Sequence, residues 1–150
     1  RMSWHMFFFQ LPLADISVPM NDFEFIHKLW REWSPDFHDY KHYSNRVVSV
    51  LKKPNVLNKA LLYYRSAFQD SLQTDRINSE AINLLSSKIQ PPCIYFHGKN
   101  DGCIDYKLST GMENFFEKIQ INILDGCGHF LHLEKPDEFN EMLLDFFTDS

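Results

Sequence analysis

The chain has 150 residues, 44% hydrophobic and 23% charged, which is enough for one modest core and argues against disorder. The net charge of -5 and the scattered Lys and Arg residues argue against a nucleic-acid partner, since phosphate binding needs a basic face. No apolar run is long enough to span a bilayer. Three cysteines without CxxC spacing are typical of free thiols in a reducing compartment, so a cytoplasmic protein is expected.

The start of the chain and its changing pattern predict two parts of a longer protein. Arg1 is followed at once by aromatic residues, without an initiator methionine, which indicates an internal boundary. Residues 1–70 carry helical patterns and nothing that alternates like a strand, so they predict an all-helical part. From residue 77 onward, short apolar runs appear between helical stretches, and a second part is expected to begin there.

The clearest helix of the first part spans Asn21–Trp33. Its apolar residues recur at spacings of three and four, as on one face of a helix: Phe23, Ile26, Leu29, Trp30 and Trp33. Asn21 or Asp22 is expected to cap its start, and Ser34-Pro35 to end it. Two further helices are expected on either side of Pro54, over Asp39–Lys52 and Asn55–Phe68.

The second part is expected to alternate helices with buried strands. The expected elements are a helix over Asn78–Lys88, a strand over Cys93–Phe96, a helix over Tyr106–Lys118, a strand over Ile119–Leu124 and a helix over Pro136–Phe147. Helices that alternate with strands are typical of an α/β fold with a parallel sheet. Two strands cannot bury both faces of such a sheet alone, so more sheet is expected than this chain supplies.

Two loops directly follow the expected strands, where functional residues of parallel sheets gather. The first loop carries Asp101 and the second carries His129. Neighbouring strand ends would bring them together, and a carboxylate that accepts a hydrogen bond from the ring fixes the tautomer of a histidine base. Singly, an Asp-Gly pair indicates a turn and a histidine among glycines indicates surface. On successive strand ends, the two residues predict an acid–base pair.

These loops resemble those of a known family. Residues 93–147 resemble the C-terminal part of an α/β-hydrolase, in which an HGxxD loop carries the acid and a GxGHF loop carries the histidine; here they are HGKND and GCGHF. The segment GCGHFLHLEKP, residues 126–136, is a long and specific match. Residues 3–12 (SWHMFFFQLP) and 61–65 (LLYYR) resemble the helical cap of the epoxide-hydrolase and dehalogenase branch.

The resemblance implies a fold and a mechanism. Residues 1–76 would be a helical cap, and residues 77–150 the C-terminal part of an α/β-hydrolase core with a parallel sheet. In that branch an upstream aspartate attacks carbon to form an ester, which water activated by His129 then hydrolyses with support from Asp101. Neither such a nucleophile nor an HGxP-type oxyanion loop occurs in these 150 residues. The N-terminal half of the core is therefore the expected partner, the substrate is a small molecule, no cofactor is implied, and the chain alone is expected to be inactive.

The cap leaves the reaction open. Epoxide hydrolases use two cap tyrosines as hydrogen-bond donors to the epoxide oxygen; Tyr64 matches one, whereas His5 stands where the other is expected. A histidine N–H can also donate to an oxygen anion, and the cap as a whole favours epoxide hydrolysis. Trp4, His5 and Tyr64 also resemble the halide-binding donors of dehalogenases, although the Trp-His order is inverted. Alternatively, His5 packs in the cap of a serine esterase, or the chain is a non-catalytic fragment or binding module.

The other histidines favour structural roles. His97, in the turn after the first strand, is expected to serve the shape of its loop, and His132 to pack beside the second loop. His38 and His42 have helical spacing but no glutamate of an HExxH motif between them, which indicates a solvated helix face. The sequence therefore predicts no metal site.

Overall fold

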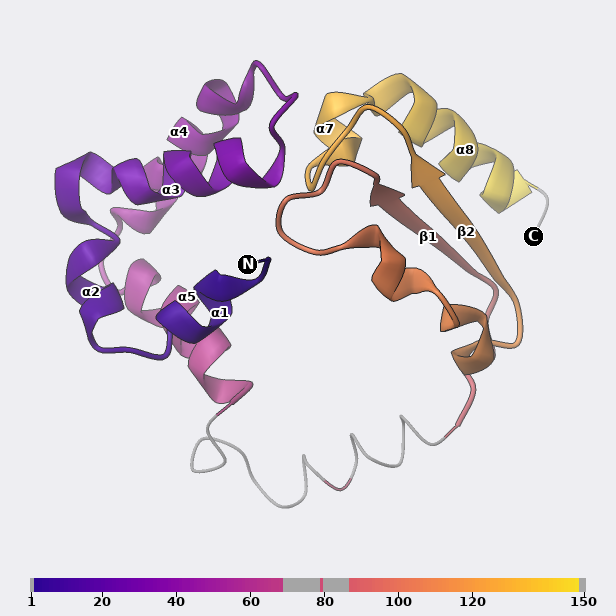
Figure 1. The fold of residues 1–150 in the computed structure, drawn as a ribbon, viewed down its shortest axis with the longest axis horizontal. Helices are drawn as coiled ribbons and strands as arrows, with labels where there is room; N and C mark the ends of the chain where they lie inside the picture. The colour runs from indigo at the N-terminus through magenta and orange to yellow at the C-terminus, as the bar shows by residue number, and fades with distance from the viewer. Residues whose placement is uncertain (1, 69–78, 80–86, 149–150) are drawn as a thin grey trace. The chain divides into compact units, whose positions relative to one another are not determined.

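The computed structural model describes residues 2–68, 79 and 87–148. The chain divides into two compact units, each described here by itself (Figure 1). The helical unit comprises Arg1–Glu32 and His38–Glu80, and the sheet unit comprises Trp33–Phe37 and Ala81–Ser150. The boundary expected between residues 76 and 77 lies outside the described residues, and the assignment of the first part as a cap stays a prediction.

The described residues of the helical unit form helices and no strand, as predicted. The helices are α1 (Trp4–Phe8), α2 (Leu13–Ser17), α3 (Met20–Trp33), α4 (Tyr40–Leu51) and α5 (Val56–Ser66). The gap between α4 and α5 contains Pro54, in agreement with the expected break. The end of α3 at Trp33, just before Ser34-Pro35, is also confirmed.

The start of α3 differs from the prediction. Asn21, Asp22 and Phe23 have positive φ angles of 50°, 56° and 65°, so the regular helix begins only after them. An N-cap residue has extended backbone, and neither Asn21 nor Asp22 has it. Asn tolerates the left-handed region better than most residues, whereas for Phe23 this conformation is uncommon.

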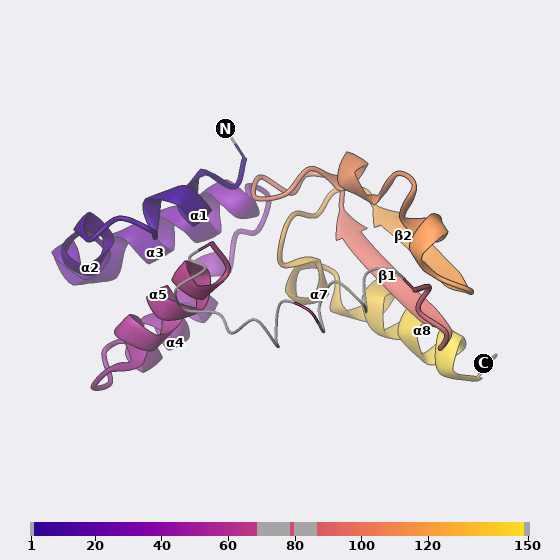
Figure 2. The same cartoon turned by 90° about the horizontal axis from the view of Figure 1, so that it is seen from below.

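The sheet unit is built on two parallel strands, β1 (Cys93–Gly98) and β2 (Ile119–Leu124). Both expected strands are confirmed, and β1 runs two residues further than predicted. Their register pairs Cys93 with Ile119 and Gly98 with Leu124, so the two strands end level with each other. A short helix, α7 (Leu131–Glu134), and a long one, α8 (Pro136–Thr148), follow β2. Figure 2 shows α8 running along the two strands.

The continuous helix expected over Tyr106–Lys118 is wrong. Two 3-10 turns, η2 (Tyr106–Ser109) and η3 (Met112–Phe115), occupy the segment instead. Thr110 between them has extended backbone, and Gly111 has a φ of 84°, which a helix does not allow. The helix expected over residues 78–88 lies almost wholly outside the described residues.

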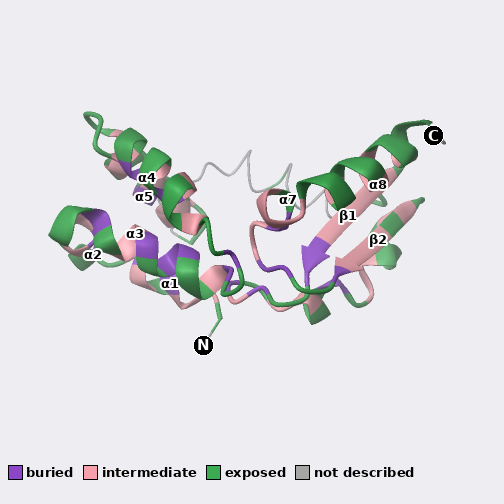
Figure 3. Cartoon of the chain, turned by 90° about the horizontal axis from the view of Figure 1, so that it is seen from above, coloured by how far each residue is buried: buried purple, intermediate pink, exposed green. Residues whose placement is uncertain are grey.

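The core of the sheet unit lies between the strands and the last two helices. Its buried members are Leu124, Cys127 and Leu131, and Phe96, Phe139 and Met142 pack against them. Within β1, only the last two residues are fully buried, and in β2 only Leu124 is (Figure 3). Burial therefore concentrates at the carboxyl ends of the strands, where the two predicted functional loops begin. No helix in the described ranges is long and apolar enough to cross a membrane.

Candidate active site

Asp101 and His129 meet at the carboxyl ends of the strands. Because Gly98 pairs with Leu124, the loops that leave β1 and β2 start side by side. His129 Nδ1 lies 2.9 Å from Asp101 Oδ2, in hydrogen-bond contact. The sequence predicted this pairing from the positions of the two residues on successive strand ends, and the structure brings them together.

The Asp101 carboxylate is buried, and both of its oxygen atoms are in hydrogen-bond contact. Its Oδ1 atom accepts hydrogen bonds from the backbone N–H groups of Cys103, at 2.6 Å, and Ile104, at 2.9 Å. Burial by itself raises the pKa of Asp101, but the hydrogen bonds from His129, Ile104 and Cys103 outweigh burial, so the pKa lies below its ordinary value. Asp101 is therefore a carboxylate at neutral pH and can only accept hydrogen bonds.

The ionised Asp101 fixes the tautomer of His129. Because the carboxylate has no proton to give, His129 Nδ1 carries the hydrogen, and Nε2 of the neutral ring keeps a free lone pair. The His129 side chain is 28% exposed, compared with 5% for Asp101, so part of the imidazole is open to solvent while Nδ1 is held by Asp101. The Trp33 ring packs edge-on against the imidazole, with centroids 5.0 Å apart. Such a ring can accept a proton from water or from a hydroxyl group.

The last residue of α3 and the residue after it hold both loops, which the sequence did not predict. The carbonyl oxygen of Trp33 accepts hydrogen bonds from the backbone N–H groups of His129 and Gly102, both at 3.1 Å. The hydroxyl oxygen of Ser34 accepts a third, at 3.0 Å, from the N–H of Phe130. In the sequence, Trp33 and Ser34 signalled only the end of a helix. A backbone carbonyl leaves no side-chain signature, so no pattern could have shown this role.

Two close backbone approaches require glycine. A Cβ atom at Gly98 would collide with the carbonyl oxygens of Cys127 and Gly128, and one at Gly128 would lie 2.7 Å from Ser34 Cα. The N–H of Gly128 donates to both carboxylate oxygens of Glu134, each at 3.0 Å. Gly98 of the HGxxD pattern thus allows the two loops to touch, and Gly128 of the GxGHF pattern allows the second loop to approach Ser34. Glu134 anchors the second loop from α7.

His97 has a contact beyond the shape of its loop. Its Nε2 atom is 3.1 Å from the carbonyl oxygen of Ile104, a bond that closes the loop as expected. The same atom also lies 3.2 Å from Asp101 Oδ2, and Nδ1 contacts the hydroxyl of Tyr95. The sequence predicted no contact between His97 and Asp101.

The side chains around Asp101 make a poor cation-binding site at neutral pH. Asp101, Cys103 and His129 could each offer a ligand atom, all within 4.8 Å of one another. However, burial and then the charge of Asp101 raise the pKa of the Cys103 thiol to about 12, so the thiolate that binds metals is scarce. The nitrogen of His129 that faces Asp101 is already committed to a hydrogen bond.

In the helical unit, the structure brings His5 and Tyr64 together. Their rings meet edge-on with centroids 5.9 Å apart, and Phe9 packs between α1 and α5 with its ring 4.8 Å from Tyr64. Gln10 Nε2 donates to the carbonyl oxygen of Tyr64 at 3.1 Å. Trp4, the third predicted member, packs its ring against Phe8 and Phe25.

Arg65 holds the Tyr64 segment from the other side. Its guanidinium donates to both carboxylate oxygens of Asp15, at 3.3 and 2.7 Å, and Nε donates to the carbonyl oxygen of Phe9 at 3.0 Å. The Arg65 side chain is 20% exposed, so water competes only in part for these bonds. This role of Asp15 could not be predicted from the sequence, because nothing in its spacing ties it to α5.

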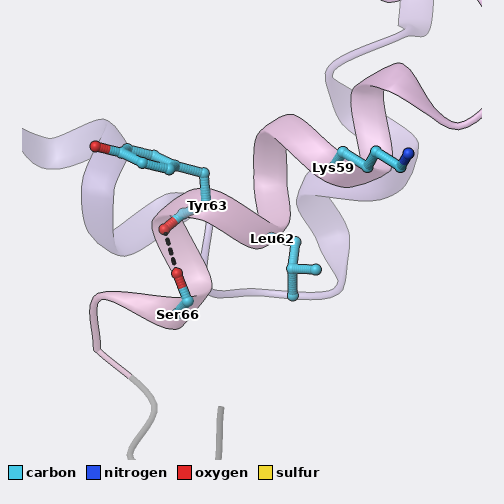
Figure 4. Close-up of a pocket in the computed structure, with 4 residues that line it drawn as sticks. All are labelled: Lys59, Leu62, Tyr63 and Ser66. Atoms are coloured by element: carbon cyan, nitrogen blue, oxygen red, sulfur yellow. Dashed lines mark hydrogen bonds between the residues drawn. The ribbon is translucent and has the colours of Figure 1, made fainter. Parts of the chain in front are cut away.

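Tyr63 and Tyr64 are adjacent but face different surroundings. Tyr63 is 77% exposed and borders a shallow hollow on α5 with Lys59, Leu62 and Ser66 (Figure 4). None of these four residues belongs to the predicted site. Asp101 and His129 lie in the sheet unit, whereas Trp4, His5 and Tyr64 lie in the helical unit.

Sequence comparison finds partial likenesses to hydrolases. No protein-family model matches the chain. The chain is similar to bifunctional epoxide hydrolase 2 of Sus scrofa, 31% identical over 64 residues, which are 42% of this chain and 12% of that protein. It is also similar to a Mycoplasma genitalium protein provisionally named esterase/lipase 1, 23% identical over 107 residues, which are 70% of this chain and 33% of that protein. The chain thus matches a third or less of each relative.

Comparison with solved structures shows the fold. A Klebsiella pneumoniae protein provisionally described as an epoxide hydrolase matches with a TM-score of 0.78 and 21% identity over 95% of this chain and 48% of that one. A Nostoc sp. PCC 7120 protein provisionally described as an α/β-hydrolase matches with a TM-score of 0.77 and 21% identity over 98% of this chain and 50% of that one. The chain therefore spans about half the length of these neighbours and has the fold of the C-terminal part of an α/β-hydrolase, as predicted.

Proposed function

We propose that this chain supplies the cap and the acid–base pair of an epoxide-hydrolase-like enzyme acting on a small molecule. The observation that carries the proposal is the 2.9 Å hydrogen bond between His129 Nδ1 and the buried, ionised Asp101. It leaves His129 with a lone pair on its exposed edge, as a general base requires. The epoxide hydrolases among the sequence relatives and structural neighbours support the choice of reaction.

The proposed reaction has two steps. In the first, an aspartate outside these 150 residues attacks an epoxide carbon and the C–O bond breaks, which forms an ester whose alkoxide takes up a proton from solvent water. In the second, His129 Nε2 removes a proton from water as the water oxygen attacks the ester carbonyl carbon. The ester C–O bond then breaks, the leaving oxygen of the diol takes the proton that His129 returns, and the carboxyl group loses its proton to solvent, which restores the aspartate. Asp101 stabilises the imidazolium that forms between these transfers.

Tyr64 and His5 are the proposed donors to the epoxide oxygen. The negative charge that develops there as the ring opens is stabilised by hydrogen-bond donors fixed in advance. The edge-on contact between the two rings places both side chains in one cluster of the helical unit, which supports a joint role. The contacts of Trp4 with Phe8 and Phe25 favour a supporting role for that residue over direct substrate contact.

An esterase is the second candidate. The Mycoplasma genitalium relative, with its esterase/lipase name, favours it, because its match covers more of this chain than the epoxide-hydrolase match does. In an esterase the outside nucleophile would be serine, and His129 would be needed to activate it. The two candidates therefore differ in whether the first step depends on His129.

This difference provides the test. We expect the full-length protein carrying His129→Gln to accumulate an ester with an epoxide such as styrene oxide, seen by intact-protein mass spectrometry as an increase equal to the substrate mass. The aspartate attacks without help from His129, whereas hydrolysis of the ester stops. His132→Gln, three residues away, is the matched control and should turn over normally without an adduct.

Other outcomes separate the candidates. An esterase with a serine nucleophile would show no adduct with the epoxide and no turnover of p-nitrophenyl esters once His129 is replaced. Normal turnover of both substrates by His129→Gln would contradict the proposal altogether. Residues 1–150 alone are expected to turn over neither substrate.

The proposal includes the setting of the enzyme. The nucleophile and the rest of the core sheet are assigned to sequence outside this chain, because the chain spans about half of its structural neighbours. A cytoplasmic location is proposed from the three cysteines, which form no disulfide with one another.

A further inference from the structure

A second histidine stands behind Asp101. Tyr95 and His97 are two residues apart on β1, so their side chains lie on the same face of the strand. His97 Nδ1 is 2.5 Å from the Tyr95 hydroxyl, and His97 Nε2 is 3.2 Å from Asp101 Oδ2, the oxygen that also receives His129. The four side chains form one continuous line from β1 to the exposed edge of His129.

The partners of His97 specify its tautomer. Nε2 faces two oxygens that can only accept, the carbonyl of Ile104 at 3.1 Å and the ionised Asp101, so Nε2 carries the hydrogen. Nδ1 is then a lone pair, and the Tyr95 hydroxyl donates to it. Each of these contacts supports the same arrangement, in which the Nε2–H of His97 donates to the Ile104 carbonyl and lies 3.2 Å from Asp101 Oδ2.

We propose that His97, locked in this tautomer by Tyr95, is a positioning residue for Asp101. Its N–H supports the carboxylate oxygen that orients His129 and takes up part of its negative charge. The inference deepens the proposed function and rests on it for the catalytic consequence only.

Burial separates the roles of the two histidines. The side chain of His97 is 7% exposed, whereas that of His129 is 28% exposed. Both ring nitrogens of His97 already have partners within the sheet unit. His97 therefore acts through Asp101, and His129 alone of the two presents a ring edge for proton transfer.

The first test reads the tautomers directly, without any substrate. Long-range 1H–15N correlation spectra of the full-length protein are expected to show His97 with hydrogen on Nε2 and His129 with hydrogen on Nδ1. In Tyr95→Phe, the His97 Nδ1 signal should move toward that of a lone pair without a hydrogen bond. His97 found with its hydrogen on Nδ1 would overturn the proposal.

The second test compares two substitutions of similar size. His97→Leu removes the donor, whereas His97→Gln restores an N–H near the former Nε2 position. We expect kcat/KM for the epoxide to fall about tenfold in His97→Leu and to stay within about threefold in His97→Gln, because the variant with leucine leaves no N–H close to the charged Asp101 oxygen. A carboxylate that is no longer held in position also changes its contact with His129, so the His129 Nδ1–H proton signal should shift in His97→Leu only.

A purely structural role predicts a different result. Both His97 variants would then have a lower unfolding temperature and an unchanged His129 Nδ1–H signal, and that outcome contradicts the proposal. If His97→Leu does not fold, Tyr95→Phe and His97→Gln decide by their spectra. The Nδ1–H proton signal of His129 should shift in His97→Leu and recover in His97→Gln even if no epoxide is hydrolysed, so failure of the proposed reaction and failure of this inference remain distinguishable.

Discussion

The two units hold their proposed functional side chains by different forces. In the sheet unit, Asp101 accepts hydrogen bonds from His129 and from two backbone N–H groups, and the backbone N–H of His129 donates to the carbonyl oxygen of Trp33. In the helical unit, His5 and Tyr64 sit among aromatic rings at centroid distances near 5–6 Å. Hydrogen bonds fix direction, whereas ring contacts fix position and tolerate repacking. The acid–base pair therefore has one working geometry, while the aromatic cluster can accommodate changes of side chain.

The largest expected effect follows from breaking the hydrogen bond between Asp101 and His129 in the sheet unit. In Asp101→Asn, the amide would turn an N–H toward His129 and favour the wrong tautomer, so kcat of the full-length protein should fall about a thousandfold or more. Asp105→Asn, in the same loop region at the start of η2, is the control and should keep activity within about threefold. A loss of less than tenfold in Asp101→Asn would show that the orientation of His129 does not depend on this carboxylate.

The same substitution changes the response to acid. The pKa of Asp101 is lowered in the folded protein, so its contribution to stability is complete above the unfolded value, about 3.9, and is lost as pH falls through the folded value. Equilibrium unfolding measured between pH 6 and pH 3 should therefore show a smaller loss of stability below about pH 4 in Asp101→Asn than in the wild type. An identical acid dependence in both proteins would argue against the hydrogen bonds assigned to this carboxylate.

The next effect concerns the contact between the two loops. Gly98→Ala should lower the free energy of unfolding by about 3 kcal/mol, because the new methyl group would meet the backbone of Cys127 and Gly128, which has little room to move. Gly126→Ala is the matched control: its φ of 68° costs an alanine about 1 kcal/mol, but no atom lies within 4 Å of the added carbon. Equal losses in urea titrations of the two variants would mean that the close approach has no energetic consequence.

Sequence reasoning succeeded where a side chain or a strand pattern carried the information. Short apolar runs predicted both strands, and their order placed Asp101 and His129 on neighbouring ends. It failed where the information lies in the backbone or in contacts between distant residues. Gly111, with its φ of 84°, broke an expected helix, and the carbonyl of Trp33 holds both loops without any sequence signature.

The contacts of the aromatic cluster were harder to predict for the same reason. Tyr63 and Tyr64 look equivalent in the sequence, and only the fold shows that Tyr63 is 77% exposed while Tyr64 packs against His5 and Phe9. A resemblance to a cap selected Tyr64, but no periodicity distinguished it from its neighbour.

Tyr64→Phe tests whether the aromatic cluster contributes a hydrogen-bond donor to the reaction. The ring contacts survive and the hydroxyl is lost, so kcat/KM for an epoxide should fall about tenfold, the value of one hydrogen bond to a developing charge. The exposed neighbour serves as control, and Tyr63→Phe should leave kcat/KM unchanged. Equal effects of the two substitutions on epoxide turnover would remove Tyr64 from the proposed donors.

The smallest expected effect concerns the hydrogen bonds that Arg65 makes beside the aromatic cluster. Arg65→Lys keeps the charge but loses the fork that reaches Asp15 and the carbonyl of Phe9, so the free energy of unfolding should fall by no more than about 1 kcal/mol, a few degrees in Tm. Arg46→Lys, on the exposed side of α4, should not lower Tm. If Arg65→Lys instead lowers kcat/KM as strongly as Tyr64→Phe, then the position of Tyr64 depends on hydrogen bonds. The functional side chains of both units would then be held by the same kind of force.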